Sequence, residues 1–199
     1  MAAGVKTVAV VPAKSLAAAK SRLAPVLDEQ QRAEVSLEML RAVLEQLRQL
    51  PDFSAYAVLS SDERALDLAR QLGASALEER QGSLNRALYL GRAWALGAEA
   101  GALLVVLSDL PLVQAGDLAE LLRIDADVVI APSKDGGTNA LLLRPPEAIP
   151  FRFGRASARH HQLEAQKRGL RVSLLERERL AFDVDTPQDL EAIRIPNAV

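Results

Sequence analysis

The stretch AGALLVVLSDLPL, residues 100–112, contains a short apolar run at residues 103–107 that ends at Ser108 and Asp109. An apolar run of this length, bounded by polar and turn residues, predicts a fully buried strand of the kind found in parallel sheets covered on both faces. Asp109 is then expected just beyond the carboxyl end of that strand.

A second stretch, LAFDVDTPQDL at residues 180–190, carries Asp183 and Asp185 and is expected to end another apolar strand. Residues two apart in an extended segment point to the same side, so both carboxylates can face one ligand. Three carboxylates beyond strand ends suit a hard divalent cation, and magnesium with a phosphorylated substrate is the usual combination. The alternative is structural, with Asp185 capping the helix that Pro187 opens and Asp109 capping a turn.

Strand and helix patterns alternate along the whole chain. Strands are expected at residues 7–11, 55–59, 75–77, 103–107, 127–131, 139–143 and 171–175. Asp28 and Gln31 have the spacing of a capping box and open a long helix with an apolar period reaching Leu47. Further helices are expected at residues 63–72, 84–96, 118–122, 157–168 and 187–193. The alternation predicts an α/β fold of three layers, in which helices cover both faces of a mostly parallel sheet.

Composition narrows the class of protein. The 199 residues are 49% hydrophobic and 25% charged, which predicts one globular domain over residues 1–199. The net charge of −2 favours neither nucleic acid nor a membrane surface, and no apolar run approaches the ~20 residues of a membrane span. Without cysteine the chain has no thiolate zinc site or cysteine nucleophile. A strand pattern from Val5 leaves no room for a signal peptide, so a cytoplasmic enzyme or binding protein is expected.

Ligands of open α/β sheets bind beyond the carboxyl ends of the strands, and four polar loops are candidates. PAKSLAAAKSRLAP (residues 12–25) has cations for a phosphate, QGSLNRAL (81–88) has Asn85 to read a base or ribose, and SKDGGTNAL (133–141) has glycines that free amides beside Thr138. In FRFGRASARHH (151–161), Gly154 and Ser157 flank a helix start suited to an anion. The alternatives for the first three loops are, in order, a solvated loop with scattered lysines, an ordinary N-terminal helix turn and a turn before a strand. His160 and His161 cannot both face one ligand and are assigned to packing or solvent.

Together these motifs resemble the CofC/FbiD family, the 2-phospho-L-lactate and phosphoenolpyruvate guanylyltransferases of coenzyme F-420 biosynthesis. The resemblance runs in order from Val8 to Leu190 through VPAKSLAAAKSRLAP, LSDLPL, DGGTNALLLRPP, FRFGRASARHH and FDVDTPQDL. It implies the Rossmann-like fold of nucleotide-diphospho-sugar (GT-A-like) transferases, GTP as donor and Mg²⁺ as metal. The first loop lacks the Gly-rich signature of sugar-nucleotide transferases.

The resemblance assigns roles to matching positions of this chain. Asp109, Asp183 and Asp185 match metal-binding aspartates, and Lys20 matches a lysine near the phosphates; these four are the expected catalytic residues. Residues that match the site of the phosphorylated three-carbon acid are Thr138, Gly154 and Ser157. With the cations of the first loop, the expected nucleotide-binding set is Ala13, Lys14, Lys20, Arg22, Gly82 and Asn85.

The resemblance implies transfer of GMP to the phosphate of phosphoenolpyruvate or 2-phospho-L-lactate. Alternatives are 3-phosphoglycerate as acceptor, another nucleotidyltransferase of this fold (using CTP or a molybdopterin acceptor), or a catalytically silent nucleotide-binding regulator. Expected partners are a homodimeric second copy and a downstream deazaflavin transferase. The sequence leaves open the acceptor acid, the oligomeric state, the number of magnesium ions and the roles of His160, His161 and Arg152.

Overall fold

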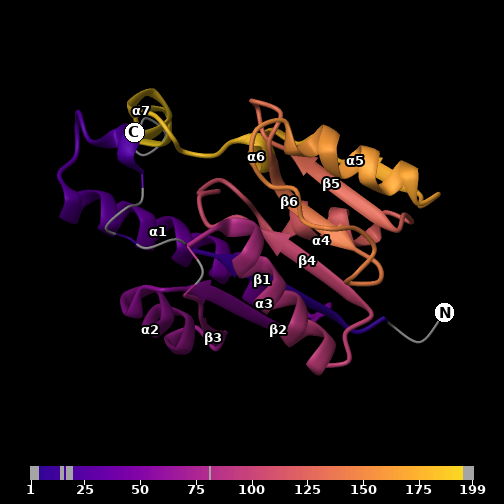
Figure 1. Ribbon diagram of the computed structural model, residues 1–199. Coiled ribbons are helices and arrows are strands. Elements are labelled where there is room, and N and C mark those ends of the chain that lie inside the picture. Colours follow the sequence, from indigo (N-terminus) through magenta and orange to yellow (C-terminus); the bar gives the residue numbers. More distant parts are fainter. Residues whose placement is uncertain (1–4, 14–15, 17–19, 81, 195–199) are drawn as a thin grey trace.

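The computed structural model describes residues 5–13, 16, 20–80 and 82–194. Among these residues it has one seven-stranded sheet of order β3-β2-β1-β4-β6-β5-β7 (Figure 1). The strands are β1 (Thr7–Pro12), β2 (Phe53–Ser60), β3 (Ser75–Glu78), β4 (Ala102–Val106), β5 (Val128–Pro132), β6 (Thr138–Leu143) and β7 (Val172–Leu174). The helices are α1 (Glu29–Arg48), α2 (Glu63–Gln71), α3 (Leu84–Gly97), α4 (Ala115–Arg123), α5 (Ser157–Lys167), α6 (Glu178–Ala181), α7 (Pro187–Arg194) and the 3-10 helix η2 (Ser21–Leu23).

The central strands are buried on both faces because their apolar residues alternate between two cores. In β4, Leu104 and Val106 pack with the helices α1, α2, α4 and α6, whereas Leu103 and Val105 pack on the side of α3 and α5. Gly91 lets α3 approach the sheet closely, since a Cβ there would lie 3.1 Å from side-chain atoms of Val10 and Leu59. The predicted three-layer α/β architecture is confirmed.

Strand β6 is the one strand among the described residues that runs against its neighbours. It pairs antiparallel with both β4 and β5, whereas the other strand pairs of the described residues are parallel. Val106 near the end of β4 pairs with Ala140 near the start of β6. The loops that enter β6 and leave β4 therefore lie at the same edge of the sheet.

Two local predictions have different outcomes. The capping box that opens α1 is confirmed, because Asp28 Oδ1 accepts from Gln31 N at 2.8 Å and Gln31 Oε1 accepts from Asp28 N at 2.9 Å. The prediction that a strand precedes Asp183 is wrong, because the short helix α6 lies there. Tertiary contacts hold that helix: Leu180 is fully buried, and Arg179 pairs with the buried Asp117 of α4 at 2.7 Å.

A small third core packs α7 against η2 and α1. Leu190 of α7 packs with Leu23, Leu27, Met39 and Val184. In Figure 1, α7 (yellow) accordingly lies beside the segment that joins β1 to α1 (indigo). Within the described ranges, no helix combines the length and apolar character needed to cross a bilayer.

Candidate active site

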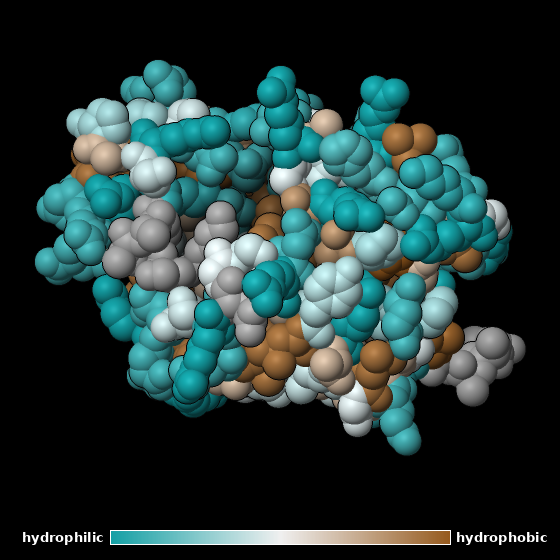
Figure 2. All heavy atoms as spheres, in the orientation of Figure 1, coloured by the Kyte–Doolittle hydropathy of each residue, from teal (hydrophilic) through white to brown (hydrophobic). Residues whose placement is uncertain are grey.

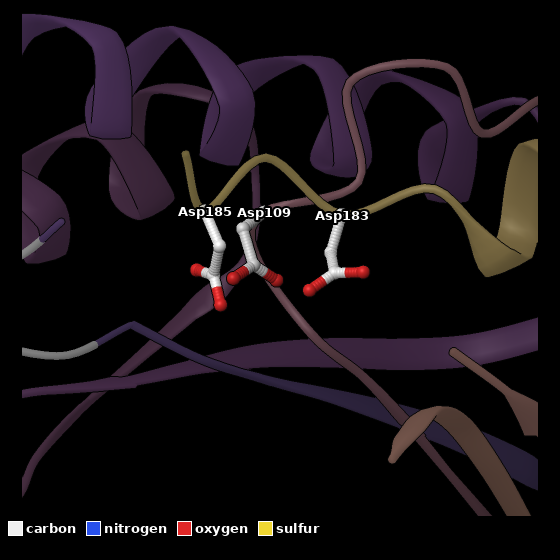
Figure 3. A group of neighbouring side chains, drawn as sticks. All are labelled: Asp109, Asp183 and Asp185. Atoms are coloured by element: carbon white, nitrogen blue, oxygen red, sulfur yellow. The ribbon is translucent and has the colours of Figure 1, made fainter. Parts of the chain in front are cut away.

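Three aspartates from two distant segments meet at the carboxyl edge of the sheet. One carboxylate oxygen from each of Asp109, Asp183 and Asp185 lies within 4.8 Å of the others. Figure 3 shows Asp109 on the segment after β4 and the other two on the extended segment before α7, with all three carboxylates directed to the same side. A backbone hydrogen bond from Val184 N to Asp109 O, 3.2 Å long, joins the two segments. The predicted meeting of the three carboxylates is thus confirmed.

The capping alternative for Asp185 is wrong. Thr186 caps α7 instead: its Oγ1 accepts from Asp189 N at 3.3 Å, and Asp189 Oδ2 accepts from Thr186 N at 2.8 Å. Asp189 is also paired with Lys134, whose Nζ donates to the backbone oxygen of Asp183 at 3.2 Å. The side chain of Asp185 is therefore free of any capping role, while its neighbours hold the segment that carries it.

Lys20 bridges the aspartate cluster. Its Nζ lies 2.6 Å from Asp109 Oδ2 and 2.9 Å from Asp185 Oδ1, and its side chain is 9% exposed. Burial lowers the pKa of Lys20, but the charges and hydrogen bonds of Asp109 and Asp185 outweigh that effect and raise it. Lys20 reaches this position from a left-handed backbone conformation (φ 52°) just before η2. Lys20 thus lies in contact with two of the other three expected catalytic residues, and its place near the phosphates stays a prediction.

Two carboxylate oxygens of the cluster have no hydrogen-bond partner among the described residues and could bind a cation. Asp109 Oδ1 and Asp183 Oδ1 are buried and lack hydrogen-bond partners. Burial, and next the charge of Asp109, raise the pKa of Asp183. Buried anionic oxygens without partners are costly, and a divalent cation with oxygen ligands would relieve that cost. These residues fit a magnesium ion, whose binding stays a prediction.

A cavity of about 280 Å³ lies beside the cluster. The face in Figure 2 is hollowed near its middle, with hydrophobic atoms on the floor and hydrophilic residues around the rim. The walls of the cavity come from the first loop, α1, the start of α3, the segment after β4 and the segment before α7. The lining residues are Pro12, Ala13, Leu16, Lys20, Ser21, Arg22, Ser36, Met39, Leu84, Leu107, Ser108, Asp109 and Asp185. Apolar walls with a charged end can hold a base and its phosphates.

The predicted nucleotide-binding residues are only partly gathered around this cavity. Ala13, Lys20 and Arg22 line it, and the Arg22 guanidinium lies 3.5 Å from Asp185. Gly82 is not among its lining residues, although Leu84 of the same turn is. Lys14 lies outside the described residues.

Asn85 holds a backbone segment in this structure. Its Nδ2 donates to Phe153 O at 2.9 Å, and its Oδ1 accepts from Phe153 N at 2.8 Å. Both ends of the carboxamide that was expected to read the nucleotide are therefore engaged. The contact ties the start of α3 to the loop that carries Gly154.

The three predicted acid-binding residues are linked by hydrogen bonds. The hydroxyls of Thr138 and Ser157 lie 3.0 Å apart, and Ser157 N donates to Gly154 O at 3.2 Å. A Cβ on Gly154 would meet no atom within 4 Å, so open space adjoins this loop. Through the pairing of β4 with β6, the group lies at the same edge of the sheet as the aspartates.

The expectation that Gly136 and Gly137 offer free backbone amides is wrong. Gly136 N donates to Ser133 O, Gly137 N donates to Asp135 Oδ1, and Ala158 N donates to Gly136 O. Tight turns satisfy their own donors locally, as buried backbone groups generally must. The hydroxyls of Thr138 and Ser157 thus become the main candidate donors.

The assignment of the two histidines to packing and solvent is confirmed, and His161 has a further contact that the sequence did not reveal. His160 is exposed, whereas His161 is fully buried against Phe153. His161 Nδ1 lies 3.1 Å from Thr138 Oγ1, and Nε2 accepts from Arg152 N at 2.9 Å. The helical spacing of His161 from Ser157 was the available signal, because residues four apart share one face.

Comparisons with known proteins agree with this geometry. Residues 7–197 match the model of the family described as "Guanylyl transferase CofC like". The chain is 46% identical to a phosphoenolpyruvate guanylyltransferase of Rubrobacter xylanophilus, covering 96% of this chain and 95% of the relative. It is 39% identical to a 2-phospho-L-lactate guanylyltransferase of Methanothermobacter thermautotrophicus, with coverage of 94% and 84%. It is 33% identical to a 3-phospho-D-glycerate guanylyltransferase of Colwellia psychrerythraea, with coverage of 96% and 92%.

Solved structures support the fold. The crystal structure of 4-diphosphocytidyl-2C-methyl-D-erythritol synthase from Anaerococcus prevotii superimposes with a TM-score of 0.69 at 9% identity, covering 97% of this chain and 96% of the other. At that identity the likeness concerns the fold alone. The family match and the identities over nearly the full length show more: the chain belongs to the family of CofC-like guanylyl transferases.

Proposed function

We propose that this chain transfers GMP from GTP to the phosphate of a small three-carbon phospho-acid, with phosphoenolpyruvate as the first candidate. The observation that carries the proposal is the aspartate cluster bridged by Lys20 beside an open cavity. Phosphoenolpyruvate ranks first because relatives at 46% and 42% identity bear that substrate in their names. 2-Phospho-L-lactate and 3-phosphoglycerate are the alternative acceptors.

In the proposed reaction, a phosphate oxygen of the acid attacks the α-phosphorus of GTP. A new bond forms between them, the bond from the α-phosphorus to its bridging oxygen breaks, and pyrophosphate leaves. The attacking phosphate has a second pKa of about 6, so it is mostly ionised at neutral pH and needs no strong base. The proposed reaction therefore does not require a pair of histidines as general bases.

The main barrier is repulsion between two polyanions, and the residues of the cluster are suited to reduce it. Asp109, Asp183 and Asp185 would hold Mg²⁺, which when bound neutralises phosphate charge and orients the phosphates. Lys20 lies at the same point and can contact a phosphate oxygen once the carboxylates bind the metal. Arg22, whose side chain is 72% exposed, can reach the phosphates from the rim of the cavity.

The proposal assigns the two substrates to neighbouring sites. The cavity beside Ala13, Met39 and Leu84 would take the nucleotide, with Gly82 at the turn that opens α3. The group formed by Thr138, Gly154 and Ser157 would take the acid. The order β4-β6 in the sheet supports this arrangement, because it brings both loops to one edge.

The first test is pyrophosphate release from GTP, ATP, CTP and UTP, each with Mg²⁺ and one acid at a time. We expect GTP to support release at least tenfold faster than the other nucleotides, and phosphoenolpyruvate to be the preferred acid. Equal rates with all four nucleotides would remove guanine from the proposal. Nucleotide binding without any release would favour a regulator.

Two expectations about partners extend the proposal. The guanylylated acid would be consumed by a transferase that joins it to a deazaflavin, and the chain would form a homodimer. Adding a purified deazaflavin transferase to the assay should convert the product further. Light scattering of the purified chain measures the assembly, and a monomeric mass would contradict the second expectation.

A further inference from the structure

His161 is a buried side chain that is linked by hydrogen bonds to the group of proposed acid-binding residues. Its side chain contacts Thr138 directly, Thr138 contacts Ser157, and the backbone of Arg152 precedes Gly154 by two residues. His161 and Ser157 are 0% and 1% exposed, and Thr138 is 2% exposed. The hydrogen bonds among these groups are therefore shielded from competing water.

The contacts of His161 determine where its proton lies. Nε2 accepts from a backbone N–H, and a backbone amide can only donate. The proton of the neutral ring must then be on Nδ1, which donates to Thr138 Oγ1 at 3.1 Å. Burial lowers the pKa of His161 to about 4, so the ring is neutral at pH 7.

With the proton on Nδ1, the donors and acceptors of the Thr138 and Ser157 hydroxyls can be counted. Thr138 Oγ1 receives the Nδ1 proton, and the hydroxyls of Thr138 and Ser157 share one hydrogen bond between them. Two hydroxyls have two hydrogens, and their mutual bond uses one. Among the described residues no acceptor is found for the second hydrogen, although both hydroxyls are nearly fully buried.

We propose that His161 is a positioning residue of the acid site: it orients the Thr138–Ser157 hydroxyl pair so that one hydroxyl hydrogen is kept for an anionic oxygen of the acid. This inference rests on the proposed function. A buried donor without an acceptor is costly in the free protein, and a carboxylate or phosphate oxygen would satisfy it on binding. The open space at Gly154, hydrogen-bonded to Ser157, leaves room for such an oxygen. Because the amides of Gly136, Gly137 and Ala158 are already engaged, the hydroxyl pair can offer a contact that these amides cannot.

Two substitutions separate the two contacts of His161. In His161→Gln the side-chain oxygen can take the place of Nε2 and accept from Arg152 N, but the donor to Thr138 is lost. In His161→Asn the amide nitrogen can take the place of Nδ1 and keep that donor. We expect His161→Gln to raise the KM for phosphoenolpyruvate roughly tenfold, the scale of one hydrogen bond to a charged group, and to leave the KM for GTP within about twofold.

For His161→Asn we expect a rise in the KM for the acid of less than about threefold, since the donor is retained. His160→Gln is the matched control, because His160 is the exposed neighbour. If both His161 substitutions lower the Tm equally and leave the KM for the acid unchanged, His161 is merely structural and the inference is overturned.

Thr138→Val separates a failure of this inference from a failure of the proposed function. If Thr138→Val leaves the KM for the acid unchanged, the acid binds elsewhere and the proposed site is wrong. If Thr138→Val raises it but His161→Gln does not, only the role of His161 is overturned. In the double substitution the KM should be no higher than in Thr138→Val alone, because His161 acts through that hydroxyl.

Thr138→Ser tests the hydroxyl pair without changing His161. It keeps the hydroxyl and removes one methyl group, so the KM for the acid should stay within about threefold. A tenfold rise would overturn the assignment to the hydroxyl. This result tests the role of the Thr138 hydroxyl even if His161→Gln does not fold, and His161→Asn then tests the role of His161.

Discussion

Asp109 and Asp183 belong to the same carboxylate cluster but have different neighbours. Each has one buried oxygen without a partner, but the other oxygen of Asp109 is paired with the buried Lys20 at 2.6 Å, whereas burial raises the pKa of Asp183. A carboxyl whose pKa is raised in the folded state makes folding less favourable when it is ionised at pH 7. The two residues should therefore respond oppositely to the loss of their charge.

We predict that Asp183→Asn lowers turnover roughly a hundredfold, the scale of a lost electrostatic stabiliser, without lowering stability. The amide keeps the shape and removes the charge that burial and Asp109 disfavour. Asp109→Asn should also abolish most turnover but should reduce stability, because Lys20 loses its nearest partner. Steady-state rates and urea midpoints without ligand measure both effects. A fully active Asp183→Asn protein would contradict the metal assignment.

We predict that His161 contributes to the pH dependence of the free energy of unfolding. Its pKa is about 4 in the folded chain and about 6.5 in the unfolded chain, mainly because burial disfavours the charged ring. The unfolded chain thus takes up the proton first as the pH falls. The stability that His161 contributes is fully present above pH 6.5 and is lost between pH 6.5 and pH 4, by up to about 3 kcal/mol.

Urea unfolding at several pH values measures this contribution. The wild type should lose more stability than His161→Gln over that window, since other titrating groups are common to both proteins. Equal losses in the two proteins would mean that the folded state does not depress the pKa of His161.

At the scale of elements, α3 serves as the support of the irregular loop at residues 144–154. Asn85 binds both backbone groups of Phe153, and Arg92 donates to Ile149 O at 2.7 Å while its guanidinium lies 4.1 Å from the centre of the Phe151 ring. Because α3 begins at the nucleotide cavity, it connects the two proposed substrate sites.

We predict that Asn85→Ala raises the KM for the acid about tenfold and the KM for GTP less, because the Gly154 loop loses two hydrogen bonds. Leu90→Ala, an exposed change on the same helix, should leave both constants unchanged. Product formation at varied concentrations of each substrate gives the two constants. A larger effect on GTP would support direct contact of Asn85 with the nucleotide, as the sequence suggested.

At the scale of the whole molecule, the site depends on a C-terminal segment folding back onto the N-terminal one. Leu190 of α7 is 5% exposed and packs with Leu23 and Met39, on either side of the loop from η2 to α1. This small core holds the segment with Asp183 and Asp185 near Lys20.

We predict that Leu190→Ala lowers the free energy of unfolding by about 2–3 kcal/mol, as expected when a buried leucine is truncated. Leu174→Ala is the control, since Leu174 is 43% exposed and should change stability little. Urea unfolding measures both. Equal effects of the two substitutions would show that α7 does not stabilise this end of the fold.

Sequence patterns are informative where structure depends on near neighbours. The capping box of Asp28 and Gln31 involves residues three apart, and the apolar period of α1 repeats within single turns. The prediction that the three aspartates meet was right, but its strand-end argument holds only for Asp109, which follows β4; Asp183 and Asp185 follow the helix α6. The helix α6 was missed because its residues are held by distant partners such as Asp117, not by a local pattern.

Periodicity, capping and motif order are properties of the chain, so they were enough to predict the alternation of strands and helices, the layers, the family and the identity of the clustered carboxylates. Which polar groups are already engaged could be read only from the folded molecule: Lys20 with aspartates 89 and 165 residues away, Asn85 with Phe153, and His161 with Thr138. Such pairings depend on how elements remote in sequence pack in space, and a buried polar group accepts whichever partner that packing provides.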